Sequence, residues 1–250
     1  LSAPANDIII LLIERRFMYS YDNKIHVIEN FINKDTANFL VKTINPETIE
    51  IPNQIGIWGG PSAAKDLFKI KPGNPISWGD ENLLIEIENW NIAMDILTMI
   101  ILSMNKTVTD FYEKEYIPTN FFYSKMCKGG KNTLHMDNVY LKNDDSKLIK
   151  KPNNGDDRSG LLYLNSEYEG GLLRFPKQNI ELKPKPGTFI FFEGNEDTPH
   201  EVTEVISGER HNIISFYWPK ENLGLRQDRF VPEDEMQMIE EKLNIYHLEK

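Results

Sequence analysis

Four residues in this chain have the types and spacing that metal-dependent oxidation requires. His135 and Asp137 lie two positions apart in the triplet His135-Met136-Asp137, and His200 follows well downstream. Two imidazoles and one carboxylate are the ligand set of a mononuclear non-haem iron site, in which they bind one face of the metal. Arg210, ten positions after His200, adds a permanent cation that could hold an anionic co-substrate. These residues predict an iron(II) and 2-oxoglutarate-dependent dioxygenase.

The coordination chemistry of iron(II) explains why these residue types are needed. Three protein ligands on one face leave three positions open, two for the keto oxygen and adjacent carboxylate of 2-oxoglutarate and one for O2. The far carboxylate of 2-oxoglutarate needs a fixed cation in a dry pocket. Arg210 suits this role because its guanidinium pairs with both carboxylate oxygens and does not lose its proton. Tyr163, a polar residue in an otherwise apolar stretch, could donate a further hydrogen bond.

A His-x-Asp triplet alone is weak evidence, because most isolated histidines are ordinary surface or core residues. The evidence here is the order in which the triplet, the tyrosine, the second histidine and the arginine follow one another. Alternate positions of a strand end would send His135 and Asp137 to the same side. The alternative for Arg210 is a surface ion pair with Glu209 or Glu204.

Short stretches of period-two apolar pattern follow Pro118, and glycine, proline or asparagine separates them. They predict strands in two packed antiparallel sheets. His211, beside Arg210, is then expected to face away from the metal and is not counted as a ligand. Because helical patterns come first, the predicted class is α+β with a jelly roll. The predicted strands are residues 120–126, 160–165, 170–175, 179–182, 188–192, 201–206 and 211–218.

Helical patterns lie before and after these strands. Residues 36–44 follow a possible cap at 33–35, residues 80–116 have a helical period, and Pro232 opens a C-terminal amphipathic helix. Residues 45–82 are predicted to be irregular, with Trp58 and Trp78 either bordering a substrate site or attaching the loop to the core. The polar residues 138–159 predict a loop, which either closes over substrate or is simply solvated.

Composition limits the classes of function. The 250 residues carry a net charge of −10, which argues against binding nucleic acid through its phosphates. The single cysteine, Cys127, is expected to be a buried apolar residue and fits a reducing compartment, so we predict a cytoplasmic protein. The apolar run 8–13 is too short to cross a membrane and is expected to be a buried strand. The predicted organisation is an extension at 1–24, a catalytic domain at 25–220 and a helical extension at 221–250.

The chain resembles the prolyl 4-hydroxylase superfamily of Fe(II)/2-oxoglutarate-dependent dioxygenases, and most closely its oxygen-sensing prolyl hydroxylase branch. The resemblance covers about residues 26–218. It is most specific at four motifs, which are His135-Met136-Asp137-Asn138, Leu162-Tyr163-Leu164-Asn165, Gly170-Gly171-Leu172-Leu173-Arg174 and Pro199-His200-Glu201-Val202.

The resemblance implies a double-stranded β-helix backed by N-terminal helices. It implies His135, Asp137 and His200 as iron ligands, with Tyr163 and Arg210 holding the 2-oxoglutarate carboxylate and Leu172 beside the same co-substrate. It also implies hydroxylation of a prolyl residue in a peptide or protein, with 2-oxoglutarate converted to succinate and CO2 by O2, and with ascorbate as a reductant.

The chain departs from the family pattern at two positions. Met126 stands where many relatives have a tyrosine, and Tyr123 or Lys125 could substitute for it, so Tyr123 is a further predicted co-substrate contact. Asn132 stands where relatives often have an aromatic residue. Both changes concern the rim of the site rather than the metal.

Two other functions fit the same residues. One is hydroxylation of a free amino acid or another small molecule, and the other is a catalytically silent jelly roll that only binds a metal or sugar. Oxidation of nucleic-acid bases is disfavoured by the acidic charge, and halogenation because Asp137 occupies the position that halide would need. The sequence predicts no oligomeric state.

Overall fold

The computed structural model describes residues 17–44, 64–71, 74–77, 89–137, 139–141, 148–150, 157–221 and 229–230. Three predictions fall outside these residues: the strand at 8–13, the roles of Trp58 and Trp78, and the helix that begins at Pro232. Within the described part of the chain, no helix is both long and apolar enough to span a lipid bilayer.

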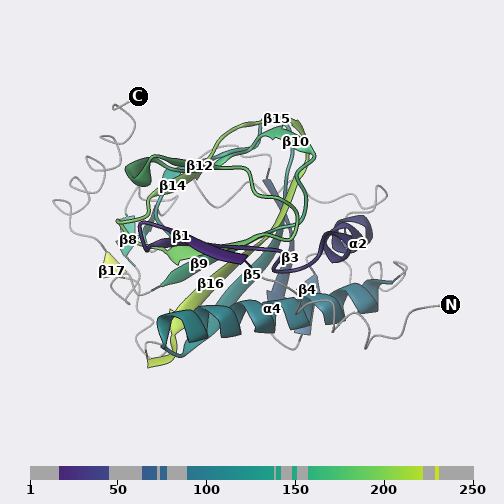
Figure 1. Cartoon of the computed structure of the whole chain (residues 1–250), viewed down its shortest axis with the longest axis horizontal. Helices are drawn as coiled ribbons and strands as arrows, with labels where there is room; N and C mark the ends of the chain where they lie inside the picture. Colours follow the sequence, from purple (N-terminus) through teal and green to yellow (C-terminus); the bar gives the residue numbers. More distant parts are fainter. Residues whose placement is uncertain are drawn as a thin grey trace.

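The largest element is an antiparallel sheet of eight strands, and helix α4 (Trp90–Tyr112) runs along one side of it (Figure 1). Helix α2 (Lys34–Ile44) lies on the same side and begins where the side chain of Asn33 accepts a hydrogen bond from the backbone of Thr36, as a helix cap does. In spatial order the strands are β1 (Phe17–Tyr21), β2 (Ile25–Glu29), β13 (Phe189–Glu193), β9 (Arg158–Tyr163), β16 (Arg210–Pro219), β5 (Tyr116–Met126), β3 (Ala64–Lys71) and β4 (Asn74–Ser77).

A smaller antiparallel sheet of four strands covers the other side of the large sheet, where Figure 1 shows β12 and β14. Two further small sheets complete the described strands. One pairs β10 (Tyr168–Gly170) with β15 (Val205–Gly208), and the other joins β17 (Arg229–Phe230), β8 (Leu148–Lys150) and β7 (Val139–Leu141). In the four-stranded sheet the spatial order is β12 (Ile180–Leu182), β11 (Leu173–Phe175), β14 (His200–Val202) and β6 (Asn132–His135).

From β5 onward, the chain passes repeatedly between the large and the four-stranded sheet. Strands β5, β9, β13 and β16 lie in the large sheet, and β6, β11, β12 and β14 lie in the smaller one. This alternation winds the chain into a double-stranded β-helix, so the predicted α+β class with a jelly roll is confirmed. The segments that carry the chemistry therefore come from strands that are far apart in sequence.

Strands β9 and β13 are buried on both faces, and β13 accordingly carries four consecutive apolar residues, whereas β9 begins with Arg158, Ser159 and Gly160 before its apolar half. One face packs against the helices in a core that includes Leu162, Phe191 and Ile213. The other face packs against the small sheet in a second core that includes Leu161, Tyr163 and Phe192. Neighbouring residues on one strand point to opposite faces, so each strand contributes alternate side chains to the two cores. The second core, between the two sheets, is also where the candidate site lies.

The structure corrects four predictions about elements. Residues 45–82 are not irregular throughout, because β3 and β4 extend the large sheet beyond β5, and an edge strand tolerates a proline such as Pro75. Residues 138–159 include the paired strands β7 and β8. The single strand predicted at 201–206 is two, since β14 pairs with β11 and β15 with β10. Helix α4 ends at Tyr112, where Glu113 adopts a left-handed conformation.

Candidate active site

His135, Asp137 and His200 converge on one point between the two sheets. His135 ends β6 and His200 begins β14, and the two residues are direct partners in the antiparallel register. One ligand atom from each of the three residues lies within 4.8 Å of the other two. The Nε2 atoms of His135 and His200 lie 3.6 and 3.5 Å from the two carboxylate oxygens of Asp137. The structure thus brings together the three residues that the sequence predicts as iron ligands, in a group that could hold a metal ion.

Backbone carbonyls orient both imidazoles. The Nδ1 atom of His135 lies 2.6 Å from the carbonyl oxygen of Thr133, and that of His200 lies 3.1 Å from the carbonyl of Thr198. A carbonyl only accepts, so each Nδ1 carries the proton and donates. In the neutral ring each Nε2 therefore has a lone pair to offer to a cation, which is how histidine ligands are usually fixed.

The electrostatic environment keeps Asp137 ionised. Burial alone raises the pKa of this carboxyl, but the charges of His200 and His135 and a hydrogen bond from the hydroxyl of Ser159 outweigh it and lower the pKa. Burial lowers the pKa of His200 to about 4, so this ring is neutral at pH 7. Burial also opposes the charge of His135, but the hydrogen bond and charge of Asp137 raise its pKa. A bound metal cation would replace that proton.

Aromatic rings close one side of the cluster. The rings of Phe192 and Phe175 lie 4.7 and 5.7 Å from the ring of His200, centroid to centroid, and both are buried. They belong to the core between the two sheets. The candidate metal ligands therefore sit against a dry wall, where charges interact more strongly than in water.

Arg210 is a buried cation on the same inner face. Only 1% of its surface is exposed. Its Nη2 donates to the phenolic oxygen of Tyr163 at 2.7 Å, and its Nη1 donates to the side-chain oxygen of Asn212 at 2.9 Å. Among the described residues no ion pair joins Arg210 to a carboxylate, and Glu209 instead pairs with Lys125 at 2.6 Å. Glu209 therefore does not form the surface ion pair with Arg210 that was the alternative prediction.

Two polar atoms around Arg210 are buried and lack a hydrogen-bond partner within the described structure, the Nε of Arg210 and the amide nitrogen of Asn212. The buried hydroxyl of Tyr168 lies beside them and interacts with the guanidinium of Arg210. Gly171 lies close by, with φ +60, and a Cβ on it would come within 3.2 Å of both Arg210 and Tyr168. Unsatisfied buried donors beside a buried guanidinium fit a carboxylate ligand, because such donors are costly without an acceptor.

Sequence reasoning missed Ser159, Tyr168 and Asn212. Two of them had a signal in the strand period, since Asn212 lies two positions after Arg210 and Ser159 four before Tyr163, on the same faces. Tyr168 had no such signal, because its strand β10 belongs to a separate small sheet.

Tyr123 lies on the wrong face to contact the co-substrate. It is fully buried in the core next to the helices, and its hydroxyl is 3.0 Å from Nδ1 of His211. Met126, three residues later, packs with Tyr163 in the core between the sheets. The prediction that Tyr123 takes the place of the family tyrosine as a co-substrate contact is therefore wrong. Odd and even positions of β5 face opposite sides of the sheet, so Tyr123 and Met126 point in opposite directions.

Leu172 is held through its backbone. Its N–H donates to the hydroxyl of Thr203 at 2.9 Å, and its carbonyl accepts from the backbone of the same threonine. At its neighbour Gly171, an added Cβ would come within 3.2 Å of the Cδ of Arg210. The role of Leu172 beside the co-substrate stays a prediction.

The sequence of the chain is similar to those of known oxygenases. The sequence model of the 2OG-Fe(II) oxygenase superfamily matches residues 121–218. Prolyl 3-hydroxylase 1 of Gallus gallus is 27% identical over 125 residues, which are 42% of this chain and 17% of that protein. Prolyl 3-hydroxylase 3 of Mus musculus is 33% identical over 97 residues, 36% of this chain and 13% of that protein. The chain thus spans less than a fifth of the length of these relatives.

A solved structure has the same fold. It is a truncated form of the viral collagen prolyl hydroxylase from Paramecium Bursaria Chlorella virus-1, with a TM-score of 0.50 and 18% sequence identity. The match covers 78% of this chain and 89% of the viral one. At this identity the similarity establishes the double-stranded β-helix alone.

Proposed function

We propose that this chain is an iron(II) and 2-oxoglutarate-dependent dioxygenase that hydroxylates an unactivated C–H bond, and the match of residues 121–218 to the sequence model of the 2OG-Fe(II) oxygenase superfamily supports the proposal. The proposal rests on two features that lie together in the space between the two sheets. A His-Asp-His cluster lies between the two sheets, and a buried arginine without a carboxylate partner among the described residues lies on the same face. A metal-binding jelly roll without activity would need the first feature but not the second.

In this proposal each polar side chain has a defined task. His135 and His200 present Nε2 to the metal, and Asp137 adds the negative charge that partly offsets a divalent cation. When bound, iron(II) supplies the redox chemistry that uses O2 and 2-oxoglutarate to oxidise a C–H bond, with succinate and CO2 as the other products. Arg210 and Tyr163 hold the far carboxylate of 2-oxoglutarate through charge-assisted hydrogen bonds. Phe175 and Phe192 keep water from the side of His200.

Asn212 and Ser159 support these groups. The Asn212 side-chain oxygen accepts from Nη1 of Arg210, Nη2 donates to Tyr163, and Nε is left for another acceptor. The Ser159 hydroxyl donates to Oδ2 of Asp137 and fixes the direction of the carboxylate. Removal of a partner of a metal ligand, as Ser159 is of Asp137, typically changes metal affinity or activity about 10- to 100-fold.

We propose a prolyl residue in a peptide or protein as the substrate. The support is that the sequence relatives are named prolyl 3-hydroxylases, although the aligned part covers only 17% and 13% of two of them. The ring carbon that is oxidised, at position 3 or 4, follows from how the substrate lies over the metal. The cytoplasmic location also stays a prediction.

The proposal is tested in two stages. Anaerobic addition of iron(II) and then 2-oxoglutarate is expected to give a weak visible charge-transfer band, and admission of O2, with ascorbate present, is expected to yield succinate. A proline-containing peptide library and a set of free amino acids are then screened for the mass gain of one oxygen atom. Absence of both the band and succinate would overturn the oxygenase. Oxidation of free amino acids alone would overturn only the peptide substrate.

A further inference from the structure

The loop that carries His200 leaves one sheet and enters the other. It begins at the end of β13 in the large sheet and ends at His200, the first residue of β14 in the small sheet. Contacts within the loop hold it in one shape. The Asn195 side-chain oxygen accepts from the backbone of Asp197, the Thr198 hydroxyl donates to the carbonyl of Glu193, and the Thr198 N–H donates to the carbonyl of Asn195.

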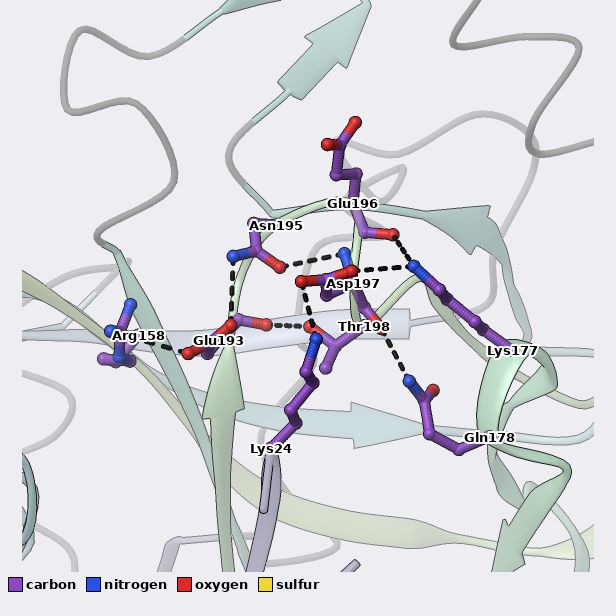
Figure 2. A network of polar contacts seen from close by, with 9 residues as sticks. All are labelled: Lys24, Arg158, Lys177, Gln178, Glu193, Asn195, Glu196, Asp197 and Thr198. Carbon is purple, nitrogen blue, oxygen red and sulfur yellow. Dashed lines mark hydrogen bonds and ion pairs between the residues drawn. The ribbon is translucent and has the colours of Figure 1, made fainter. Parts of the chain in front are cut away.

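Two lysines from different parts of the fold meet on Asp197 in this loop (Figure 2). The Nζ of Lys24 lies 2.6 Å from Oδ2 of Asp197, and the Nζ of Lys177 lies 2.7 Å from Oδ1. Gln178 adds a hydrogen bond of 2.6 Å from its side-chain nitrogen to the backbone carbonyl of Asp197. The hydrogen bonds from Lys177 and Lys24 lower the pKa of Asp197, so the carboxylate is ionised at neutral pH.

Strand register explains why these residues meet. Lys24 lies in the turn between β1 and β2, and Ile25 at the start of β2 pairs with Phe192 near the end of β13. Lys177 lies in the 3-10 helix η1 (Pro176–Gln178), which follows β11, the neighbour of β14 in the small sheet. Asp197 is thus bound from the large sheet by one lysine and from the small sheet by the other.

Asp197 is connected to His200 through the next residue in the chain, Thr198. The carbonyl of Thr198, directly after Asp197, accepts the Nδ1 proton of His200 at 3.1 Å and so sets the rotation of the ring. A shift of Asp197 would move this carbonyl and turn Nε2 away from Asp137. We propose that Asp197, held between Lys24 and Lys177, is a positioning residue for the distal metal ligand His200. The inference rests on the proposed metal site.

A simple surface ion pair would behave differently. The Asp197 side chain is 39% exposed and those of Lys24 and Lys177 are 31% and 34% exposed, so the charges by themselves contribute little to stability. A positioning role acts on the geometry of His200 instead. Metal affinity should therefore fall by more than the stability of the metal-free protein.

The test uses Mn(II) binding, followed by the electron paramagnetic resonance signal of free Mn(II), and thermal unfolding in EDTA. We expect Asp197→Asn to raise the Mn(II) Kd about tenfold, as loss of a partner of a metal ligand does. Lys24→Met combined with Lys177→Met should match it, and Lys177→Arg should remain near the unmodified protein. Asp110→Asn is the control, since Asp110 pairs with Lys106 on the exposed face of α4 and should leave the Kd unchanged.

The outcomes separate this inference from the proposed function. If the unmodified protein does not bind Mn(II), or His200→Ala binds it equally well, the metal site fails and this inference fails with it. If the unmodified protein binds and Asp197→Asn binds with the same Kd, only the positioning role is overturned, whatever happens to the melting temperature. Should Asp197→Asn not fold, Lys24→Met and Lys177→Met decide by the same criterion.

Discussion

Arg210 donates a hydrogen bond from Nη2 to the hydroxyl of Tyr163 at 2.7 Å, and the centre of its guanidinium lies 4.8 Å from the centre of the tyrosine ring. The two residues come from neighbouring strands, β16 and β9, and both are buried. A buried cation fixed by a neutral phenol has charge left for a further anion. We therefore expect both Arg210 and Tyr163 to bind the far carboxylate of 2-oxoglutarate, with the larger contribution from the charged Arg210.

Replacing Arg210 by Gln should mainly weaken 2-oxoglutarate binding. The loss of a charge-assisted hydrogen bond costs about 1.5–3 kcal/mol, so the KM for 2-oxoglutarate should rise roughly 10- to 100-fold. Tyr163→Phe removes a neutral hydrogen-bond donor and should raise the KM for 2-oxoglutarate by about fivefold. Initial rates of succinate formation at varied 2-oxoglutarate concentration measure both. An unchanged KM in Arg210→Gln would place the arginine outside the co-substrate pocket.

His135→Ala and His200→Ala should abolish succinate formation and weaken Mn(II) binding strongly, because each removes one of three ligands. Asp110→Asn on the outer face of α4 is the matched control and should keep full activity. Succinate assays and Mn(II) titrations provide the readout. Turnover at the unmodified rate in either alanine variant would contradict the ligand assignment.

Tyr123→Phe should leave the KM for 2-oxoglutarate unchanged and lower stability. Its hydroxyl is bonded to Nδ1 of His211 on the face of the sheet opposite the site, and loss of one such hydrogen bond costs about 1 kcal/mol. Urea denaturation and steady-state kinetics check the two parts separately. A raised KM with unchanged stability would return Tyr123 to the role that the sequence suggested.

Because of the buried His26, we expect the free energy of unfolding to fall in mild acid. This residue is 1% exposed, its ring is tilted against the rings of Phe111 and Phe191 at 4.1 and 4.9 Å between centroids, and its Nδ1 lies 2.7 Å from the Ser20 hydroxyl. Burial, assisted by the charge of Arg158, lowers its pKa from 6.5 to about 4. Below pH 6.5 the unfolded chain takes up a proton that the folded chain refuses. The free energy of unfolding should therefore fall by about 3 kcal/mol from this group between pH 6.5 and 4, with no contribution above pH 6.5.

Comparison with His26→Gln isolates this effect. Urea denaturation at pH 4 to 8 in EDTA should show a shallower fall in the free energy of unfolding of the variant, by up to about 1.4 kcal/mol per pH unit between pH 6.5 and 4. His211, whose pKa burial also lowers to about 4, contributes equally to both proteins. Identical slopes would mean that the pKa of His26 is the same in the folded and the unfolded chain, which would contradict the lowered pKa.

The strands of the jelly roll were largely predictable from sequence, because each buried stretch carries its own period-two pattern or continuous apolar run. The predicted stretches 120–126, 188–192 and 211–218 lie within or nearly coincide with β5, β13 and β16. Strands β3, β4, β7 and β8 were not predictable. Their segments are rich in proline or in charged residues, and their pairing depends on an edge supplied by another part of the chain.

The sequence by itself determined which residues can bind a metal and an anion, because ligand chemistry depends on residue type and on the order in which the types follow one another. Only the tertiary structure decided which face of each strand points into the site. That choice removed Tyr123, added Ser159, Tyr168 and Asn212, and brought Lys24 and Lys177 to Asp197. The physical reason is strand register, which sets every long-range neighbour at once and which no short stretch of sequence encodes alone.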